Sequence, residues 1–294
     1  MRKISHSRMY RMRRCHRMDY YRSRLGLEPV EVNQNFALGT AMHNAIALWD
    51  TGTPPDEAIV AAITGTRCDE KNIAVLHGLF AGYCHRYHED ANLCTHQPEV
   101  RIESHVTGLR GWRSVAIIDD LATTQTGKKI LFERKTTSED VSDTSEYWER
   151  VRHDTQVLYY SLELALQRIN VQSIWWDAIR KPTIRQKQNE TLEEYSARLA
   201  LDCQERPDFY FARREMPILE NDLAIFAEER KNVCLQIAEN ERREKRFANP
   251  CRAWARCGIN KKNCGGCEFR RFCFNNIEIE PGQIPDGFQQ RGTR

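Results

Sequence analysis

Residues 130–135, Ile-Leu-Phe-Glu-Arg-Lys, decide how this chain of 294 residues is interpreted. The apolar run from Ile130 to Phe132 predicts a buried strand that ends in a charged pair. Successive side chains of a strand point to opposite faces, so Glu133 and Lys135 share one face. On that face the carboxylate can hold a hard divalent cation, and the ammonium can stabilise an anion that develops beside it.

A second carboxylate precedes this stretch at hairpin distance. Residues 116–133 are expected to form two short apolar strands joined by the turn-forming sequence Thr-Thr-Gln-Thr-Gly-Lys. Folding the hairpin about Thr126 places Asp119 opposite Glu133. Two carboxylates and water suit Mg²⁺ or Mn²⁺, which prefer octahedral oxygen shells. Asp120 is the alternative ligand because a register change of one residue would exchange the two. Asp119 is favoured because the residues before it are small or apolar.

Two helices flank the hairpin in the sequence and add polar side chains. In a helix expected at residues 36–50, His43 follows Gly39 by four positions, so both lie on one helical face. An imidazole added to two carboxylates favours Mn²⁺ somewhat, relative to a site made of oxygen ligands alone. In the helix expected after the hairpin, Gln156 and Tyr160 are also four positions apart. Both can hydrogen-bond a phosphate or orient a metal-binding carboxylate.

These motifs, in this order, resemble the RecB-like branch of the PD-(D/E)xK nucleases. That branch includes the CRISPR-associated RecB-like exonucleases, the nuclease domain of AddB, exonuclease V and phage relatives. The matching motifs are Gly39-x-x-x-His43, Ile118-Asp119-Asp120-Leu121, Glu133-x-Lys135-Thr136 and Gln156-x-x-x-Tyr160. The resemblance implies a restriction-endonuclease-like α/β fold, with a mixed central sheet flanked by helices.

The resemblance also implies roles for these side chains. The metal ligands would be His43, Asp119 and Glu133. Lys135 would position the attacking water or stabilise charge on the phosphate, and the Gln156 and Tyr160 pair would contact the substrate or the site. Two positions differ from the motif residues of this family. Ala116 stands where the family usually has Gly, which keeps a small residue, and Arg134 is interpreted as an ordinary variable position.

The C-terminal region contains a cysteine cluster of the form C-x2-C-x5-C, made by Cys264, Cys267 and Cys273. The first two thiolates can bind one metal centre around a Gly-Gly turn, and the third returns after a short loop. In RecB-like nucleases with an iron–sulfur cluster, a fourth cysteine lies far toward the N-terminus, and Cys15 resembles it. The resemblance therefore implies a [4Fe–4S] cluster in a helical region formed by both termini.

Two further cysteines leave the ligand set open. Cys251 or Cys257 could replace one of the C-terminal ligands. A zinc knuckle that uses Cys251, Cys257, Cys264 and Cys267 is the alternative metal site. Clustered cysteines in an intracellular chain indicate metal before disulfides.

Charge is distributed unevenly along the chain. The net charge is only +3, but nine arginines and lysines face one acid, Asp19, within the first 24 residues. Interleaved tyrosines at positions 10, 20 and 21 could stack on bases beside a phosphate backbone. A solvated basic helix face explains the same pattern equally well. The sequence shows no apolar run long enough for a bilayer, and its charged start argues against a secretory signal.

Four regions are expected from these patterns. They are a basic N-terminal helix with one cluster cysteine (1–35), a nuclease core (36–182) with a helical insertion (56–93), a C-terminal helical region with the cysteine cluster (183–275) and a flexible tail (276–294).

The expected function is that of a cytoplasmic, bacterial or phage-encoded, metal-dependent DNA nuclease. We expect an exonuclease that acts on single strands or DNA ends in repair or recombination, with a helicase or a recombination or CRISPR complex as a candidate partner. One alternative is a non-cleaving nucleic-acid-binding subunit of a recombination or CRISPR-adaptation complex. Another is a zinc-binding nucleic-acid interaction protein.

Overall fold

The computed structural model describes residues 1–90, 94–217, 219–258 and 264–292. The chain divides into two compact units. One unit contains residues 32–102 and 116–223 and is called the nuclease unit, after the nuclease core expected from the sequence; the terminal unit contains residues 1–31, 103–115 and 224–294. The expected core boundary at residue 182 therefore differs from this division, which keeps residues 183–223 with the core.

The nuclease unit is built on a mixed sheet, as expected. Its strands are β3 (Cys94–Thr95), β4 (Pro98–His105), β5 (Trp112–Thr124), β6 (Lys129–Thr137), β7 (Ser173–Arg180) and β8 (Phe211–Met216). β5 and β6 are antiparallel, β6 and β7 are parallel, and β7 and β8 are antiparallel. The strands β4 and β5 are each divided between the two units. Residues up to 102 of β4 and from 116 of β5 belong to the nuclease unit, and the rest of both strands belongs to the terminal unit.

The predicted hairpin between β5 and β6 is confirmed. Thr124 accepts a hydrogen bond from the backbone of Gly127, which has a φ of 79°. Glycine adopts this left-handed conformation without the steric cost that a Cβ would add. The turn fixes a register in which Asp120 lies opposite Phe132.

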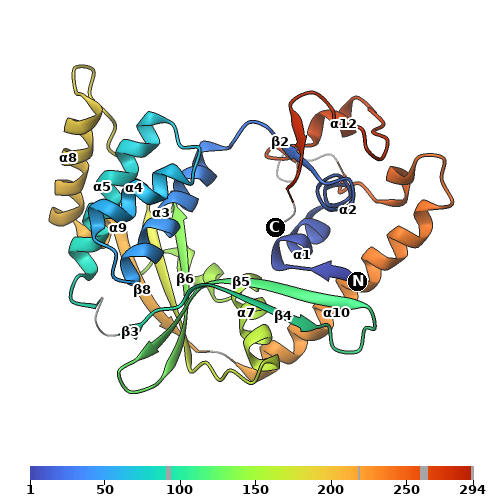
Figure 1. Cartoon of the computed structure of the whole chain (residues 1–294), viewed down its shortest axis with the longest axis horizontal. Helices are drawn as coiled ribbons and strands as arrows, with labels where there is room; N and C mark the ends of the chain where they lie inside the picture. The colour runs from blue at the N-terminus through green and yellow to red at the C-terminus, as the bar shows by residue number, and fades with distance from the viewer. Residues whose placement is uncertain (91–93, 218, 259–263, 293–294) are drawn as a thin grey trace. The chain divides into compact units, whose positions relative to one another are not determined.

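Helices cover both faces of the sheet. They are α3 (Gln34–Asp50), α4 (Pro55–Thr64), α5 (Glu70–Tyr87), α6 (Glu146–Val151), α7 (Thr155–Leu166), α8 (Leu192–Glu205) and α9 (Pro207–Tyr210). The helices α3, α4, α5 and α8 gather side by side (Figure 1). Their shared core includes Ile179 of β7 and Phe211 of β8, so they cover one face. On the other face, Trp176 of β7 donates a hydrogen bond to Tyr147 of α6.

Close helix packing explains two glycines in α5. A Cβ added at Gly78 would lie 2.8 Å from Leu199, and one added at Gly82 would lie 2.3 Å from the Cβ of Cys203. Both contacts are too short for carbon atoms, so α5 and α8 can only approach this closely at glycine. Residues 56–93, expected as an insertion, thus supply most of α4 and all of α5 to the core.

The terminal unit brings both ends of the chain together. Its elements are β1 (Arg2–Ile4), α1 (His6–Arg14), α2 (His16–Asp19), the π-helix η1 (Tyr20–Arg24), β2 (Leu27–Pro29), α10 (Glu220–Glu244), the 3-10 helix η3 (Pro250–Ala253), α12 (Arg270–Phe274) and β9 (Phe288–Gln290). The strand β2 pairs with β9, so part of the tail expected to be flexible is a strand. The ring of Tyr20 lies 5.8 Å from that of Trp254.

The single N-terminal helix expected over residues 1–35 is instead broken at Cys15. This residue has extended backbone angles, φ −166° and ψ 117°, between α1 and α2. The basic residues of this segment are partly neutralised, because the buried Asp19 pairs with Arg8 and Arg11. Tyr20 and Tyr21 are also buried, so these two rings cannot stack on bases as the sequence suggested. Among the described helices, none is long and apolar enough to cross a membrane.

Candidate metal centre

The site forms where β5 and β6 stop pairing. The ladder runs from Thr123–Lys129 to Asp120–Phe132, and one more step of this register sets Asp119 across from Glu133. The backbone N–H of Arg134 donates a hydrogen bond of 3.2 Å to Oδ2 of Asp119. The hairpin therefore brings the two predicted carboxylates together, through the alternation of side chains along each strand.

Glu133 is the most deeply buried member of the site. Its side chain is fully buried and forms an ion pair with Lys135. The pair with Lys135 is made at Oε1, whereas Oε2 has no hydrogen-bond partner among the described residues. Burial raises the pKa of Glu133 to about 8 against the opposing pull of Lys135, and the neighbouring Asp119 adds to the rise. A buried oxygen without a partner is costly, so Oε2 is the atom left for a bound cation to satisfy.

Lys135 is anchored by the helix after the hairpin. Its Nζ donates a 2.9 Å hydrogen bond to Oε1 of Gln156, whose Nε2 donates in turn to the hydroxyl of Tyr160 at 2.8 Å. Burial alone would lower the pKa of Lys135, but Glu133 and Asp119 outweigh burial and raise it. The start of α7 is fixed because the Asp154 side chain accepts a hydrogen bond from the backbone N–H of Gln156. The ammonium is therefore charged and held in place.

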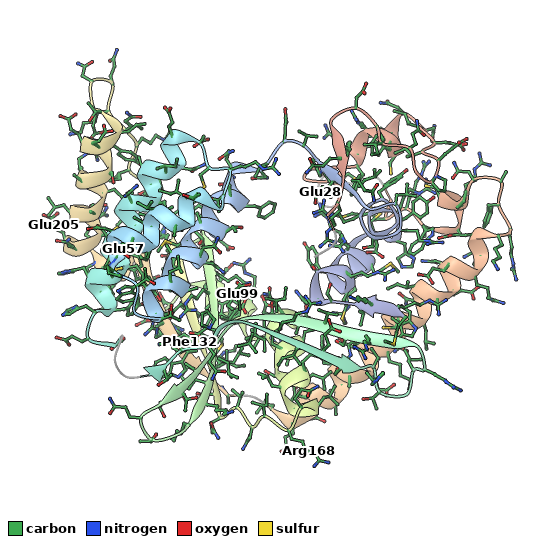
Figure 2. All side chains as sticks on the ribbon, viewed as in Figure 1. Glu28, Glu57, Glu99, Phe132, Arg168 and Glu205 are labelled. Atoms are coloured by element: carbon green, nitrogen blue, oxygen red, sulfur yellow. The ribbon has the colours of Figure 1, made fainter. Side chains whose placement is uncertain are left out.

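His43 reaches the carboxylates from α3. Its Nδ1 lies 3.5 Å from Oδ2 of Asp119. Burial lowers the pKa of His43, which favours the neutral imidazole that metals bind. A Cβ at Gly39 would lie 4.0 Å from Oγ1 of Thr136, so the N-terminal half of α3 packs on the end of β6. Phe132, labelled in Figure 2, marks β6 just before the site.

Asp120, the alternative ligand, lies in a different surrounding. Its Oδ2 is 2.5 Å from Nδ1 of His96 and 3.1 Å from the guanidinium of Arg134. Asp50, His96 and Asp120 bring ligand atoms within 4.8 Å of one another, a second group that could hold an ion. Sequence reasoning missed Asp50 and His96, because neither carries a motif and both are distant from the hairpin in the sequence.

The residues of the first group fit a hard divalent cation. Asp119 and Glu133 supply carboxylate oxygens, of which Oε2 of Glu133 has no hydrogen-bond partner among the described residues, and His43 adds a nitrogen. Mg²⁺ and Mn²⁺ prefer this kind of ligand set completed by water. Lys135 adds a fixed positive charge beside it.

A second candidate centre lies within the terminal unit. Five cysteines, together with Met18, Tyr21 and Phe269, line one cavity there; they are Cys15, Cys257, Cys264, Cys267 and Cys273. The sulfur atoms of Cys257 and Cys264 are 4.0 Å apart. Cys251 does not line this cavity and contacts the hydroxyl of Tyr21 at 3.4 Å instead.

A family model described as the PD-(D/E)XK nuclease superfamily matches residues 3–274. A comparison with curated proteins finds no match.

Solved structures with a similar course of the chain include a putative exonuclease from Eubacterium rectale, at 12% identity and a TM-score of 0.49, covering 96% of this chain and 91% of that one. SSO0001 matches at 12% identity and a TM-score of 0.35, covering 89% and 93%. LHK-Exo in complex with dAMP matches at 12% identity and a TM-score of 0.30, covering 73% and 97%.

Proposed function

This chain belongs to the PD-(D/E)XK nuclease superfamily, and on that premise we propose that it is a divalent-metal-dependent deoxyribonuclease. The observation that carries the proposal is the buried Glu133, whose Oε1 pairs with Lys135 and whose Oε2 lacks a hydrogen-bond partner among the described residues, with Asp119 and His43 close by. Such a set suits phosphodiester hydrolysis, in which negative charge develops on a phosphate.

Each side chain then has a distinct task. His43, Asp119 and Glu133 hold Mg²⁺ or Mn²⁺, which supplies an activated water and draws charge from the scissile phosphate. Lys135 places its ammonium beside a phosphate oxygen. Gln156 keeps that ammonium aimed at the site, and Tyr160 keeps the Gln156 amide oriented. Because Lys135 is held before substrate arrives, little reorganisation is needed during the reaction.

The finer proposal is exonucleolytic action on single strands or DNA ends, with a role in repair or recombination. It rests on the resemblance to RecB-like exonucleases. The experiment is an Mn²⁺-dependent assay on single- and double-stranded DNA labelled at either end, with Glu133→Ala as the matched variant. Wild-type protein should release labelled nucleotides or short fragments, and the variant should not. If the two proteins cut equally poorly, the enzyme proposal fails and the non-cleaving DNA-binding alternative is favoured.

For the terminal unit we propose a [4Fe–4S] cluster bound by Cys15, Cys264, Cys267 and Cys273. Thiolates are the ligands that such clusters take, and these four line a common cavity. Cys257 lines the same cavity and stays the alternative ligand. The zinc alternative needs Cys251, which lies off the cavity. Anaerobic purification tests the choice, because a colourless protein with stoichiometric zinc and no iron would overturn the cluster.

A further inference from the structure

Arg134, the residue between Glu133 and Lys135, is almost completely buried. Its exposed fraction is 2%. The guanidinium forms ion pairs with Asp50 and with Asp120 and lies 5.1 Å from the centre of the Phe132 ring. An ordinary variable position on a strand would not bury a permanent charge. A buried guanidinium is strongly destabilising unless carboxylates pair with it, so the positions of Asp50 and Asp120 are constrained by Arg134.

The partners of Arg134 are themselves tied down. Asp120 is fully buried, and besides the guanidinium it contacts His96 at 2.5 Å and accepts a 3.1 Å hydrogen bond from the backbone of Gln97. The Asp120 carboxylate is thus held by three partners, and the guanidinium of Arg134 is one of them.

Each anchor of this group sits beside a residue of the metal centre. Asp120 follows Asp119 on β5, and Arg134 lies between Glu133 and Lys135 on β6. Asp50 lies seven residues after His43 on α3, which is two helical turns and hence the same side of the helix. One buried guanidinium therefore joins the three elements that carry the metal ligands.

Strand alternation separates the two groups chemically. Glu133 and Lys135 point to one face of β6, and Arg134 points with Phe132 to the other. The ion pairs of Arg134 with Asp50 and Asp120 therefore lie on the face of β6 opposite the metal ligands and do not compete for the metal. A guanidinium has a planar, forked shape that can bridge two carboxylates, whereas a lysine ammonium is a point charge on a flexible stem.

We propose that Arg134, through Asp50 and Asp120, is a positioning residue that fixes α3, β5 and β6 so that His43, Asp119 and Glu133 converge on one metal ion. The inference rests on the proposed metal centre. Supporting residues behind metal ligands typically change metal affinity or activity by about 10–100-fold when replaced. Arg134 would act at that level without contacting metal or DNA.

The experiment measures Mn²⁺ affinity by calorimetry on full-length Arg134→Lys, with circular dichroism to establish folding. Arg150→Lys is the matched control, because Arg150 pairs with Glu139 on the surface of the same unit. The folded Arg134→Lys variant should bind Mn²⁺ about 10–100-fold more weakly, while Arg150→Lys should match wild type. Excess Mn²⁺ should restore part of the lost nuclease activity, as expected for a defect in ligand placement.

A second variant keeps the test decisive if Arg134→Lys does not fold. Asp50→Asn removes the α3 anchor but leaves the pair between Arg134 and Asp120, so it should fold with weakened Mn²⁺ binding. Wild-type affinity in either folded variant would overturn the positioning role. Wild-type protein that binds no Mn²⁺ would overturn the metal centre and the inference together, which separates the two failures.

Discussion

The Nδ1 atom of His43 lies 3.5 Å from Oδ2 of Asp119, so a helix and a strand from distant parts of the sequence meet at the candidate metal centre. Burial lowers the pKa of His43 and favours its neutral form at physiological pH. A neutral imidazole and a carboxylate at this separation can share a cation. Through this contact, α3 supplies a third ligand to the metal site proposed on β5 and β6.

Replacing His43 by alanine should weaken Mn²⁺ binding by about 10-fold or more, because one ligand is lost. The loss should be smaller for Mg²⁺, which depends more on oxygen ligands. Calorimetric titration of each metal measures both. His85→Ala is the control, since His85 is exposed on α5 of the same unit. Unchanged Mn²⁺ affinity in His43→Ala would remove this residue from the ligand set.

Lys135 and Gln156 should act as one unit in catalysis. Lys135→Met should lower kcat by about 100–1,000-fold, as for a lost group that stabilises transition-state charge. Gln156→Leu should cost less, because the ammonium remains but loses its 2.9 Å anchor. In the double variant, the Gln156 change should add almost nothing to the loss from Lys135→Met. Fully additive losses in single-turnover kinetics would show that Gln156 works independently of Lys135.

The metal-free protein should lose stability as pH rises toward 8, because of Glu133. Its pKa is raised from an ordinary value near 4.5 to about 8 by burial. A group with a raised folded-state pKa contributes stability that is complete below the unfolded pKa and is lost as pH rises to the folded value. Thermal unfolding between pH 6 and 9, without metal, should therefore show a Tm that falls up to about pH 8 and then levels off.

The Glu133→Gln variant provides the control for this pH dependence. The amide cannot ionise, so its Tm should change little between pH 6 and 9. Added Mn²⁺ should flatten the wild-type profile as well, because the cation compensates the buried charge. A wild-type profile that stays parallel to that of the variant would assign the pH dependence to other groups.

A buried ion pair between Asp177 and Arg213 should matter for stability and not directly for chemistry. Asp177 is 1% exposed, lies 2.5 Å from Nε of Arg213 and accepts a 2.7 Å hydrogen bond from Tyr83. Asp177→Asn removes the buried counter-charge of Arg213 and leaves its pair with the more exposed Asp90, which should lower the free energy of unfolding by about 3 kcal/mol, the lower end for a broken buried pair. Urea denaturation measures it, and Asp208→Asn, at an exposed pair with Arg86, should change little.

Periodicity explains why the hairpin was predictable from the sequence. Strand alternation places Glu133 and Lys135 on one face whatever surrounds them, and the Gly127 turn sets the register. The choice between Asp119 and Asp120 was harder, because adjacent residues of a strand face opposite sides. It needed the positions of His43 and His96, which only the packing of α3 and the chain before β4 supplies.

Tertiary contacts explain what could not be predicted. Nothing near Arg134 in the sequence distinguishes a buried guanidinium from a surface one, because Asp50 and His96 come from distant segments. The break at Cys15 is similar. The segment has helical residues on both sides, and its extended conformation accompanies a backbone hydrogen bond from Arg17 to Ala255 near the other end of the chain. Such contacts override local helix propensity.

Individual cysteine variants should separate the ligands of the terminal unit. Cys15→Ser and Cys267→Ser should each lose most iron after anaerobic purification, together with the visible absorbance of a [4Fe–4S] cluster, because both line the cavity. Cys251→Ser should keep its iron, since Cys251 does not line the cavity and lies behind it against the hydroxyl of Tyr21. Cys68→Ser, in the nuclease unit, controls for nonspecific loss.

Because Cys257 can replace a lost ligand, the amount of iron that each variant retains identifies which cysteines bind the cluster. It lines the cavity and its sulfur lies 4.0 Å from that of Cys264, so it is near enough to substitute for a lost ligand. Cys264→Ser should therefore retain part of its iron, and Cys257→Ser/Cys264→Ser should retain none. Full iron in Cys15→Ser would contradict the N-terminal ligand, and full iron in the double variant would contradict the proposed role of the C-x2-C pair.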